Sequence, residues 1–365
     1  KKAHVEVVPG QQIGVSDLAV DISKGKNVVQ GSLSQDNHGI DATGVNQISA
    51  SLVVDNPFGL ADQWIWNVLQ SGDKPSFATN QSMSLSVPFG FSTLTARSGN
   101  SESERLVVGA YESFILRSKS DSWSASWSRV LYRDADSKFI VDIERGRRAS
   151  HSYIDDTEIH VQFRDQAHQK VTVTWQQRTD NGRWELGFST TTGRPDLGGQ
   201  DDAPDLRANE GTRRFNVDRY TLSRTAEYKT ARQKTFTVEN NFNLQQSSHV
   251  LLGTEMASIG SAYTVRGFDG GNALTAESAW YLQTKLGMPW GFGNEAQTWA
   301  AIDIGRVGGP SSNNLSGREL VGFSVGQNAN FGEFSYDLSI AIPVSAPIHV
   351  QSQKPVFRAS IKASF

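Results

Sequence analysis

The sequence ends in the stretch Val356-Phe357-Arg358-Ala359-Ser360-Ile361-Lys362-Ala363-Ser364-Phe365. Apolar and polar side chains alternate along it, and this period of two predicts a strand with two different faces. An ordinary edge strand would also alternate, but here one face carries two cations. Because a cation facing lipid near the membrane midplane costs about 2 to 4 kcal/mol, the phase places Arg358 and Lys362 in a lumen. Phe357 and Phe365 then face lipid, and the stretch predicts the last strand of a transmembrane β-barrel.

The same alternation recurs along residues 27–365 in segments of about ten residues, which is the length of a tilted membrane-spanning strand. The clearest segments are residues 48–54, 83–87, 123–127, 139–143, 171–175, 184–188 and 334–342. Along the whole of residues 27–365 we count about sixteen such strands, and bacterial barrels have an even number of strands. A soluble β-sandwich with its polar faces outward is the alternative. The sequence thus predicts an all-β protein with an antiparallel transmembrane barrel of about sixteen strands.

Aromatic residues and loop lengths favour the barrel over the sandwich. Short turns predicted at residues 55–59, 88–90, 133–136 and 180–182 alternate with long loops predicted at residues 99–118, 149–169, 193–214 and 250–272. Such alternation is typical of barrels with short periplasmic turns and long extracellular loops. Aromatic side chains gather near the predicted strand ends, as in two interfacial girdles: Trp64, Trp66, Phe89, Phe91, Tyr132, Trp280, Trp290 and Phe292.

Two arginines do not fit the simple pattern. Arg129 and Arg224 fall in the apolar phase of their segments. Either they lie at the membrane interface and extend their guanidinium groups toward water, or a β-bulge shifts the register beside them. The sequence leaves both explanations open.

Composition excludes several classes of protein. The 365 residues carry a net charge of −3, without the basic excess of a nucleic-acid-binding protein. Only 37% are hydrophobic, and no apolar run approaches the roughly 18 to 20 residues of a transmembrane helix. The seven histidines lack metal-site spacing, and there is no G-x-S-x-G motif. We therefore expect no catalytic residue, no metal and no cofactor. The absence of cysteine suits an oxidising envelope compartment.

Residues 263–271 form a loop whose central arginine has apolar neighbours. Arg266 stands between Val265 and Phe268, which is unusual for a solvated loop tip. An exposed turn with a chance arginine is one reading. The other is a loop folded back into the lumen, where Arg266 meets an acidic partner. Asp303 is the candidate, because the flanking apolar residues of its strand face lipid and leave the carboxylate in the lumen. Breaking such a pair, once desolvated, costs about 3 to 5 kcal/mol.

These stretches resemble motifs of one family. Val265-Arg266-Gly267-Phe268 resembles the VRG(Y/F) motif at the tip of the sixth extracellular loop in two-partner secretion transporters, the FhaC-like TpsB family. Residues 301–305 resemble that family's F-x-D-x-G strand motif, with Ala301 in place of Phe. Residues 55–60, 129–134 and 153–156 match further family segments in the same order. The resemblance covers residues 27–365.

The resemblance implies a barrel whose long sixth loop folds inward and gates the pore. Val265, Arg266, Gly267 and Phe268 would be the gating motif, with Asp303 and Gly305 as its lumenal counterpart. Phe357 and Phe365 would belong to the C-terminal signal for outer-membrane assembly. Residues 27–365 would form the barrel, and residues 1–26 the C-terminal remnant of a periplasmic POTRA domain.

The implied function is export of one large, unfolded β-helical partner protein of the TpsA type across a Gram-negative outer membrane. An adhesin, a cytolysin or a contact-dependent inhibition toxin would fit. Other implied partners are outer-membrane lipid with lipopolysaccharide, and the barrel-assembly machinery during biogenesis. A monomer is expected, and no nucleic acid. A BamA-like barrel-assembly insertase shares both motifs and is the nearest alternative, followed by a general diffusion porin. An enzyme is disfavoured by the missing motifs, although barrels can carry enzymes.

Overall fold

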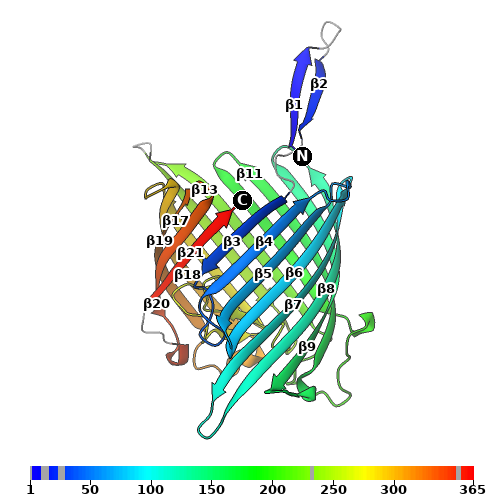
Figure 1. Cartoon of the computed structure of the whole chain (residues 1–365), viewed down its shortest axis with the longest axis vertical. Coiled ribbons are helices and arrows are strands. Elements are labelled where there is room, and N and C mark those ends of the chain that lie inside the picture. The colour runs from blue at the N-terminus through cyan, green and yellow to red at the C-terminus, as the bar shows by residue number, and fades with distance from the viewer. Residues whose placement is uncertain (1, 10–15, 24–28, 231–233, 351–354) are drawn as a thin grey trace.

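The computed structural model describes residues 2–9, 16–23, 29–230, 234–350 and 355–365, and these form a closed β-barrel with a separate hairpin (Figure 1). Across the described residues, sixteen antiparallel strands close the barrel. This confirms the predicted fold class. In chain order the strands are β3 (Val29–Asp36), β4 (Gln47–Asp55), β5 (Gln63–Asp73), β6 (Ser76–Phe89), β7 (Ser92–Val108), β8 (Ser113–Arg133), β9 (Ser137–Ile154), β11 (Arg164–Thr179), β12 (Gly182–Gly193), β13 (Asn216–Lys229), β14 (Thr235–Gln246), β17 (Ser278–Met288), β18 (Asn294–Gly308), β19 (Glu319–Phe331), β20 (Phe334–Ser345) and β21 (Val356–Ser364).

Short elements lie between these strands. Strand β10 (Thr157–Glu158) adds two residues to the edge of β9. Strands β15 (Ala257–Ile259) and β16 (Leu274–Ala276) pair with each other inside the connection between β14 and β17. Single turns of 3-10 helix complete the list: η1 (His160–Gln162), η2 (Pro195–Leu197), η3 (Pro310–Asn314) and η4 (Ile348–Val350). The described residues include no helix long and apolar enough to cross a membrane.

The last strand closes the barrel in the predicted phase. Phe357 is 56% exposed on its outer face, whereas Arg358 is 4% exposed on its lumenal face. Phe365 donates its backbone N–H to the Gly31 carbonyl at 2.9 Å and accepts the Gly31 N–H at 2.8 Å. A side chain at Gly31 would overlap the Phe365 ring. The chain terminus is therefore part of the closing seam between β21 and β3.

Two predicted long loops are wrong. Strands β7 and β8 continue through residues 99–118 and leave only residues 109–112 as a turn, and most of residues 149–169 lie in β9 and β11. Residues 99–104 are polar on both faces, as in the 3.4 Å ion pair of Glu102 with Lys119 between β7 and β8, whereas residues 106–108 and 114–116 are apolar on both faces. The alternation of apolar and polar residues is therefore lost here while the strands continue. The long connections around residues 193–214 and 250–272 are confirmed, as residues 194–215 and 247–277.

The structure resolves the two irregular arginines. The Arg224 guanidinium lies 4.7 Å from the centre of the Trp184 ring and 2.5 Å from the Tyr228 hydroxyl, in a strand whose register is continuous. Arg129 pairs with Ser92, the first residue of β7, and the register shifts just beyond it, between Val130 and Tyr132. The continuous register excludes a bulge at Arg224 and leaves the interfacial explanation for it, whereas a bulge lies close to Arg129.

The N-terminal hairpin is outside the barrel wall. Strand β1 (Lys2–Pro9) pairs antiparallel with β2 (Ser16–Ser23) in a sheet of its own. In Figure 1 it projects from the upper rim, the rim toward which β21 runs. The start of the predicted barrel domain, residues 27 and 28, lies outside the described residues, and the first barrel strand begins at Val29.

Candidate functional site

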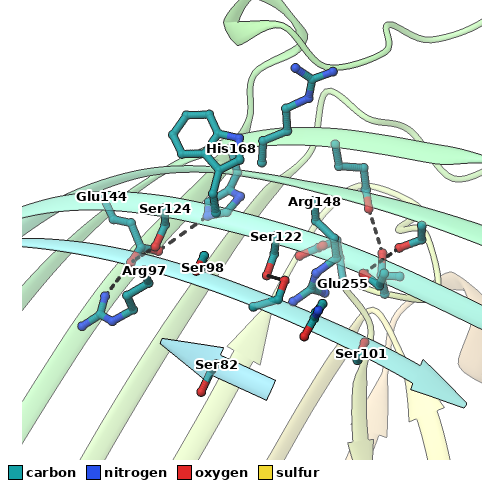
Figure 2. A pocket seen from close by; sticks show the side chains of 18 of the residues that line it. Ser82, Arg97, Ser98, Ser101, Ser122, Ser124, Glu144, Arg148, His168 and Glu255 are labelled. Carbon is teal, nitrogen blue, oxygen red and sulfur yellow. Dashed lines mark hydrogen bonds and ion pairs between the residues drawn. The ribbon is translucent and has the colours of Figure 1, made fainter. Parts of the chain in front are cut away.

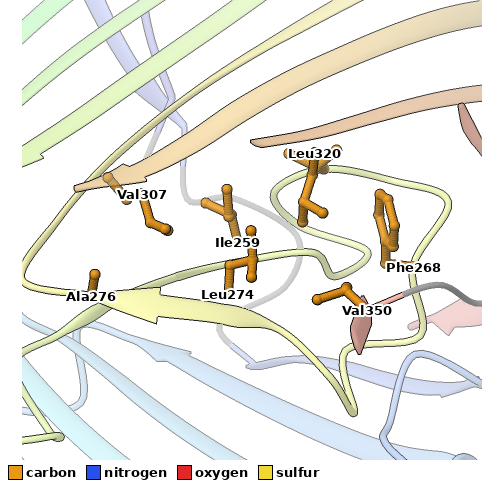
Figure 3. Close-up of a cluster of buried hydrophobic side chains, with 9 residues drawn as sticks. Ile259, Phe268, Leu274, Ala276, Val307, Leu320 and Val350 are labelled. Atoms are coloured by element: carbon orange, nitrogen blue, oxygen red, sulfur yellow. The ribbon is translucent and has the colours of Figure 1, made fainter. Parts of the chain in front are cut away.

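The connection between β14 and β17, residues 247–277, packs against the inner face of the barrel, and we call it the inner loop. Five of its side chains meet Ala279, Val307, Leu320 and Val350 in one buried apolar cluster, the inner-loop core (Figure 3). The five are Ile259, Val265, Phe268, Leu274 and Ala276, each at most 1% exposed. Ala279, Val307 and Leu320 lie on the lumenal faces of β17, β18 and β19. The inner loop therefore has its own hydrophobic attachment to one side of the lumen.

At the tip of the inner loop, Arg266 binds Asp303 of β18 through three hydrogen bonds. Its backbone N–H and its Nε donate to Oδ2 at 2.9 and 2.6 Å, and Nη2 donates to Oδ1 at 2.6 Å. Asp303 is 1% exposed, because Ile302 and Ile304 on either side point outward and leave the carboxylate inside. The planar guanidinium matches both carboxylate oxygens at once, which is the strongest ion-pair geometry available to an arginine.

Two glycines of the barrel wall make this close approach feasible. A Cβ atom on Gly305 of β18 would lie 2.8 Å from a methyl carbon of Val265, and one on Gly322 of β19 would overlap the carbonyl oxygen of Arg266. Within the motif, Gly267 has φ +106, a conformation that other residues adopt rarely. The barrel wall thus has no side chains at the two positions where the loop backbone lies against it.

An aromatic ring completes the surroundings of Arg266. Trp299, 5% exposed, has its ring centre 5.4 Å from the Arg266 guanidinium carbon and 5.7 Å from the Lys285 Nζ. It shares the lumenal face of β18 with Ala301 and Asp303. Sequence reasoning missed Trp299. The available signal was its position two residues before Ala301. The family motif has Phe at the position of Ala301, and Trp299 lies on the same face of the strand as that position.

The last strand also holds the inner loop. Arg358, predicted only to face the lumen, donates from Nη2 to the Phe268 carbonyl at 2.6 Å. The Tyr263 ring meets the His38 ring edge-on, with centres 5.9 Å apart. The structure thus brings together Val265, Arg266, Gly267, Phe268, Asp303 and Gly305. Phe357 and Phe365 lie on the outer surface and belong to the barrel seam instead.

A closed, sixteen-stranded barrel with a lumenal ion pair holding an inner loop defines the class: a transmembrane β-barrel of the outer-membrane type. Comparison with protein families then specifies the family. Residues 14–329 match the family of haemolysin secretion/activation proteins ShlB/FhaC/HecB, and the chain belongs to that family. Among the described residues, no group of three or more His, Asp or Glu side chains is arranged to hold a metal ion.

Individual relatives agree with this assignment. The chain is similar to the outer membrane transporter CdiB-2 of Burkholderia pseudomallei, at 30% identity over 94% of this chain and 59% of that protein. It therefore spans about three fifths of that relative. The structure of CdiB from Escherichia coli matches with a TM-score of 0.91 at 22% identity, over 100% of this chain and 68% of that one. BamA from Haemophilus ducreyi matches with a TM-score of 0.63 at 12% identity, over 100% and 75% respectively, and shares the fold alone.

Proposed function

We propose that this chain forms the outer-membrane pore of a two-partner secretion transporter, which exports a large, unfolded secreted partner protein. The Arg266–Asp303 pair carries the proposal, because a buried bidentate pair in the lumen is costly to desolvate and needs a purpose beyond closing a barrel. Family membership and relatives named outer membrane transporters support it. Their names also support a location in the outer membrane of a Gram-negative bacterium.

The inner loop sets the free cross-section of this pore. It covers the lumenal faces of β17 to β19 through the inner-loop core and reaches β21 through Arg358. The Arg266–Asp303 pair fixes the register in which it docks. The loop therefore acts as a gate in the sense that its docked position determines how much of the lumen remains open.

Other parts of the chain fit the same function. Residues 1–26 would be the end of a periplasmic POTRA domain, a proposal supported by the separate hairpin at the barrel rim. Phe357 and Phe365, 56% and 70% exposed, would face lipid and lipopolysaccharide and would be read by the barrel-assembly machinery. No nucleotide is hydrolysed at this membrane, so folding of the exported chain outside the cell is the driving process we propose.

Secretion in cells tests the proposal. The whole transporter is expressed with its secreted partner, and the partner in the medium is compared for wild type, Arg266→Ala and Arg306→Ala. Arg306 serves as the control because it lies on β18 and also pairs with a carboxylate, that of Glu319 on β19 at 3.0 Å, but both side chains are more than half exposed. We expect Arg266→Ala to lower secretion while heat-modifiable gel mobility shows a folded barrel, and Arg306→Ala to secrete normally. Normal secretion by Arg266→Ala would refute a role for the docked loop.

A further inference from the structure

The lumenal wall across from the inner loop is rich in small hydroxyl groups, and Arg97, Asp142, Glu144 and Arg148 share this face with them. On β8 every second residue is a serine, from Ser118 to Ser128, while Trp123 on the alternate phase is 53% exposed outside. The register places hydroxyl residues of neighbouring strands beside them. We call this surface of β6 to β9 the hydroxyl wall: Ser82, Ser84, Ser86, Thr93, Thr95, Ser101, Ser103, Ser118, Ser120, Ser122, Ser124, Ser126, Ser128, Ser150 and Ser152.

Many of these hydroxyls already have partners within the wall. Ser120 and Ser150 lie 3.1 Å apart, Ser122 donates to the Gly99 carbonyl at 3.2 Å, and Ser86 lies 3.0 Å from Thr95. A hydroxyl both donates and accepts, so such a surface can exchange these bonds for others at little net cost. It offers a passing chain no apolar patch to which it would adhere, and Arg97 and Glu144 on the same face form an ion pair at 3.1 Å.

A cavity of about 770 Å³ lies against the hydroxyl wall (Figure 2). Part of the charge on its lining is paired, since Glu144 lies 3.1 Å from Arg97 and 3.6 Å from His168, while Arg148 and Lys170 add positive charge to it. Thr254 and Glu255 of the inner loop line the facing side. The docked loop is therefore one boundary of the space that remains open.

The lumen thus has two unlike halves. Around the barrel, β6 to β9 lie opposite β18 to β21, which carry the docked loop. We infer that an exported polypeptide passes in extended form along the hydroxyl wall while the inner loop stays docked. This inference rests on the proposed function and adds to it the path of the substrate and the state of the loop during transport.

The absence of cysteine from this chain allows a direct test. Ser122→Cys places one thiol on the hydroxyl wall. Ser324→Cys is the matched control, because Ser324 also faces the lumen but is 1% exposed on β19, two residues from Gly322 beneath the loop. The probe is a long, unfolded peptide of Gly, Ser and Asn with one activated disulfide, added to the purified protein in a planar bilayer. We expect the peptide to couple to Ser122→Cys about tenfold faster than to Ser324→Cys, because disulfide exchange requires an accessible thiolate.

A second variant tests whether the loop stays docked. Val265→Cys with Gly305→Cys would link the loop to β18, since a methyl carbon of Val265 lies 2.8 Å from the Cβ position of Gly305. We expect the unmodified peptide to block the current equally before and after reduction of this disulfide. Blocking only after reduction, or faster coupling at Ser324→Cys, would overturn the inference and leave the pore intact. A protein that forms no channel, or a channel no peptide ever blocks, would overturn the proposed function as well.

Discussion

Replacing Arg266 with alanine should loosen the inner loop by a predictable amount. The substitution removes two of the three hydrogen bonds to Asp303 and leaves a carboxylate that is 1% exposed without its counter-charge. Removing one partner of a buried pair costs about 3 to 5 kcal/mol. Since about 1.4 kcal/mol is tenfold in an equilibrium constant, the ratio of docked to undocked loop should fall between about a hundredfold and several thousandfold.

The remaining attachments determine what this loss looks like. Ile259, Val265, Phe268 and Leu274 stay buried in the inner-loop core, and each apolar side chain contributes about 1.5 to 3 kcal/mol. In the Arg266→Ala variant the inner loop should therefore alternate between a docked and an undocked position. In single-channel recordings from a planar bilayer we expect a small, flickering conductance for the wild type. The mutant should add a second, larger level with long dwell times.

Arg306→Ala is the matched control for this measurement. Arg306 pairs with Glu319 at 3.0 Å with side chains 52% and 63% exposed, and such pairs contribute at most about 1 kcal/mol. Its conductance should equal that of the wild type. A large, steady wild-type conductance that neither substitution changes would point to an ordinary diffusion porin and refute the reasoning about the loop.

Three further outcomes are expected. Gly305→Val should mimic Arg266→Ala in conductance because its side chain would occupy the place of the docked loop, whereas Gly308→Val, with open space around its Cβ, should behave as wild type. Deletion of Phe365 should slow barrel assembly, measured as loss of the heat-modifiable band, because it removes a pair of seam hydrogen bonds. The Arg214 hydrogen bond lowers the pKa of Asp201 to about 2, so this pair should stabilise the connection between β12 and β13 above pH 3.8 and lose its effect only as the pH falls through about 2. The ¹³C shift of the Asp201 carboxyl group would check this.

The sequence predicted the barrel because lipid and lumen impose opposite requirements on alternate residues. Where that contrast holds, as along β18 or β21, the phase of every side chain was readable. It failed for residues 99–118, since residues 99–104 are polar on both faces and residues 106–108 and 114–116 are apolar on both faces. Backbone pairing continues there without a period of two, and the segment then looks like a loop.

The site was predictable to the extent that it depends on strand phase. Asp303 faces the lumen by the pattern of its neighbours, and the structure places Arg266 against it. Trp299 and Arg358 were not assigned to the loop, because a single sequence does not show which lumenal residues the loop reaches. The inner-loop core was equally hidden, since Leu274 and Leu320 come from segments 46 positions apart and meet only when the loop folds inward.

The two measurements on Arg266→Ala separate a gate that forms part of the conduit from a simple plug. If the inner loop only obstructed the lumen, releasing it would raise conductance and secretion together. If the docked loop bounds the path along the hydroxyl wall, as the placement of Thr254 and Glu255 indicates, releasing it widens the lumen and removes one side of that path. Small ions then pass more easily, while an extended polypeptide meets a mobile loop with newly exposed apolar side chains. Higher conductance with lower secretion in the same variant is therefore the result that only a docked, working loop explains, and a parallel rise in both would refute it.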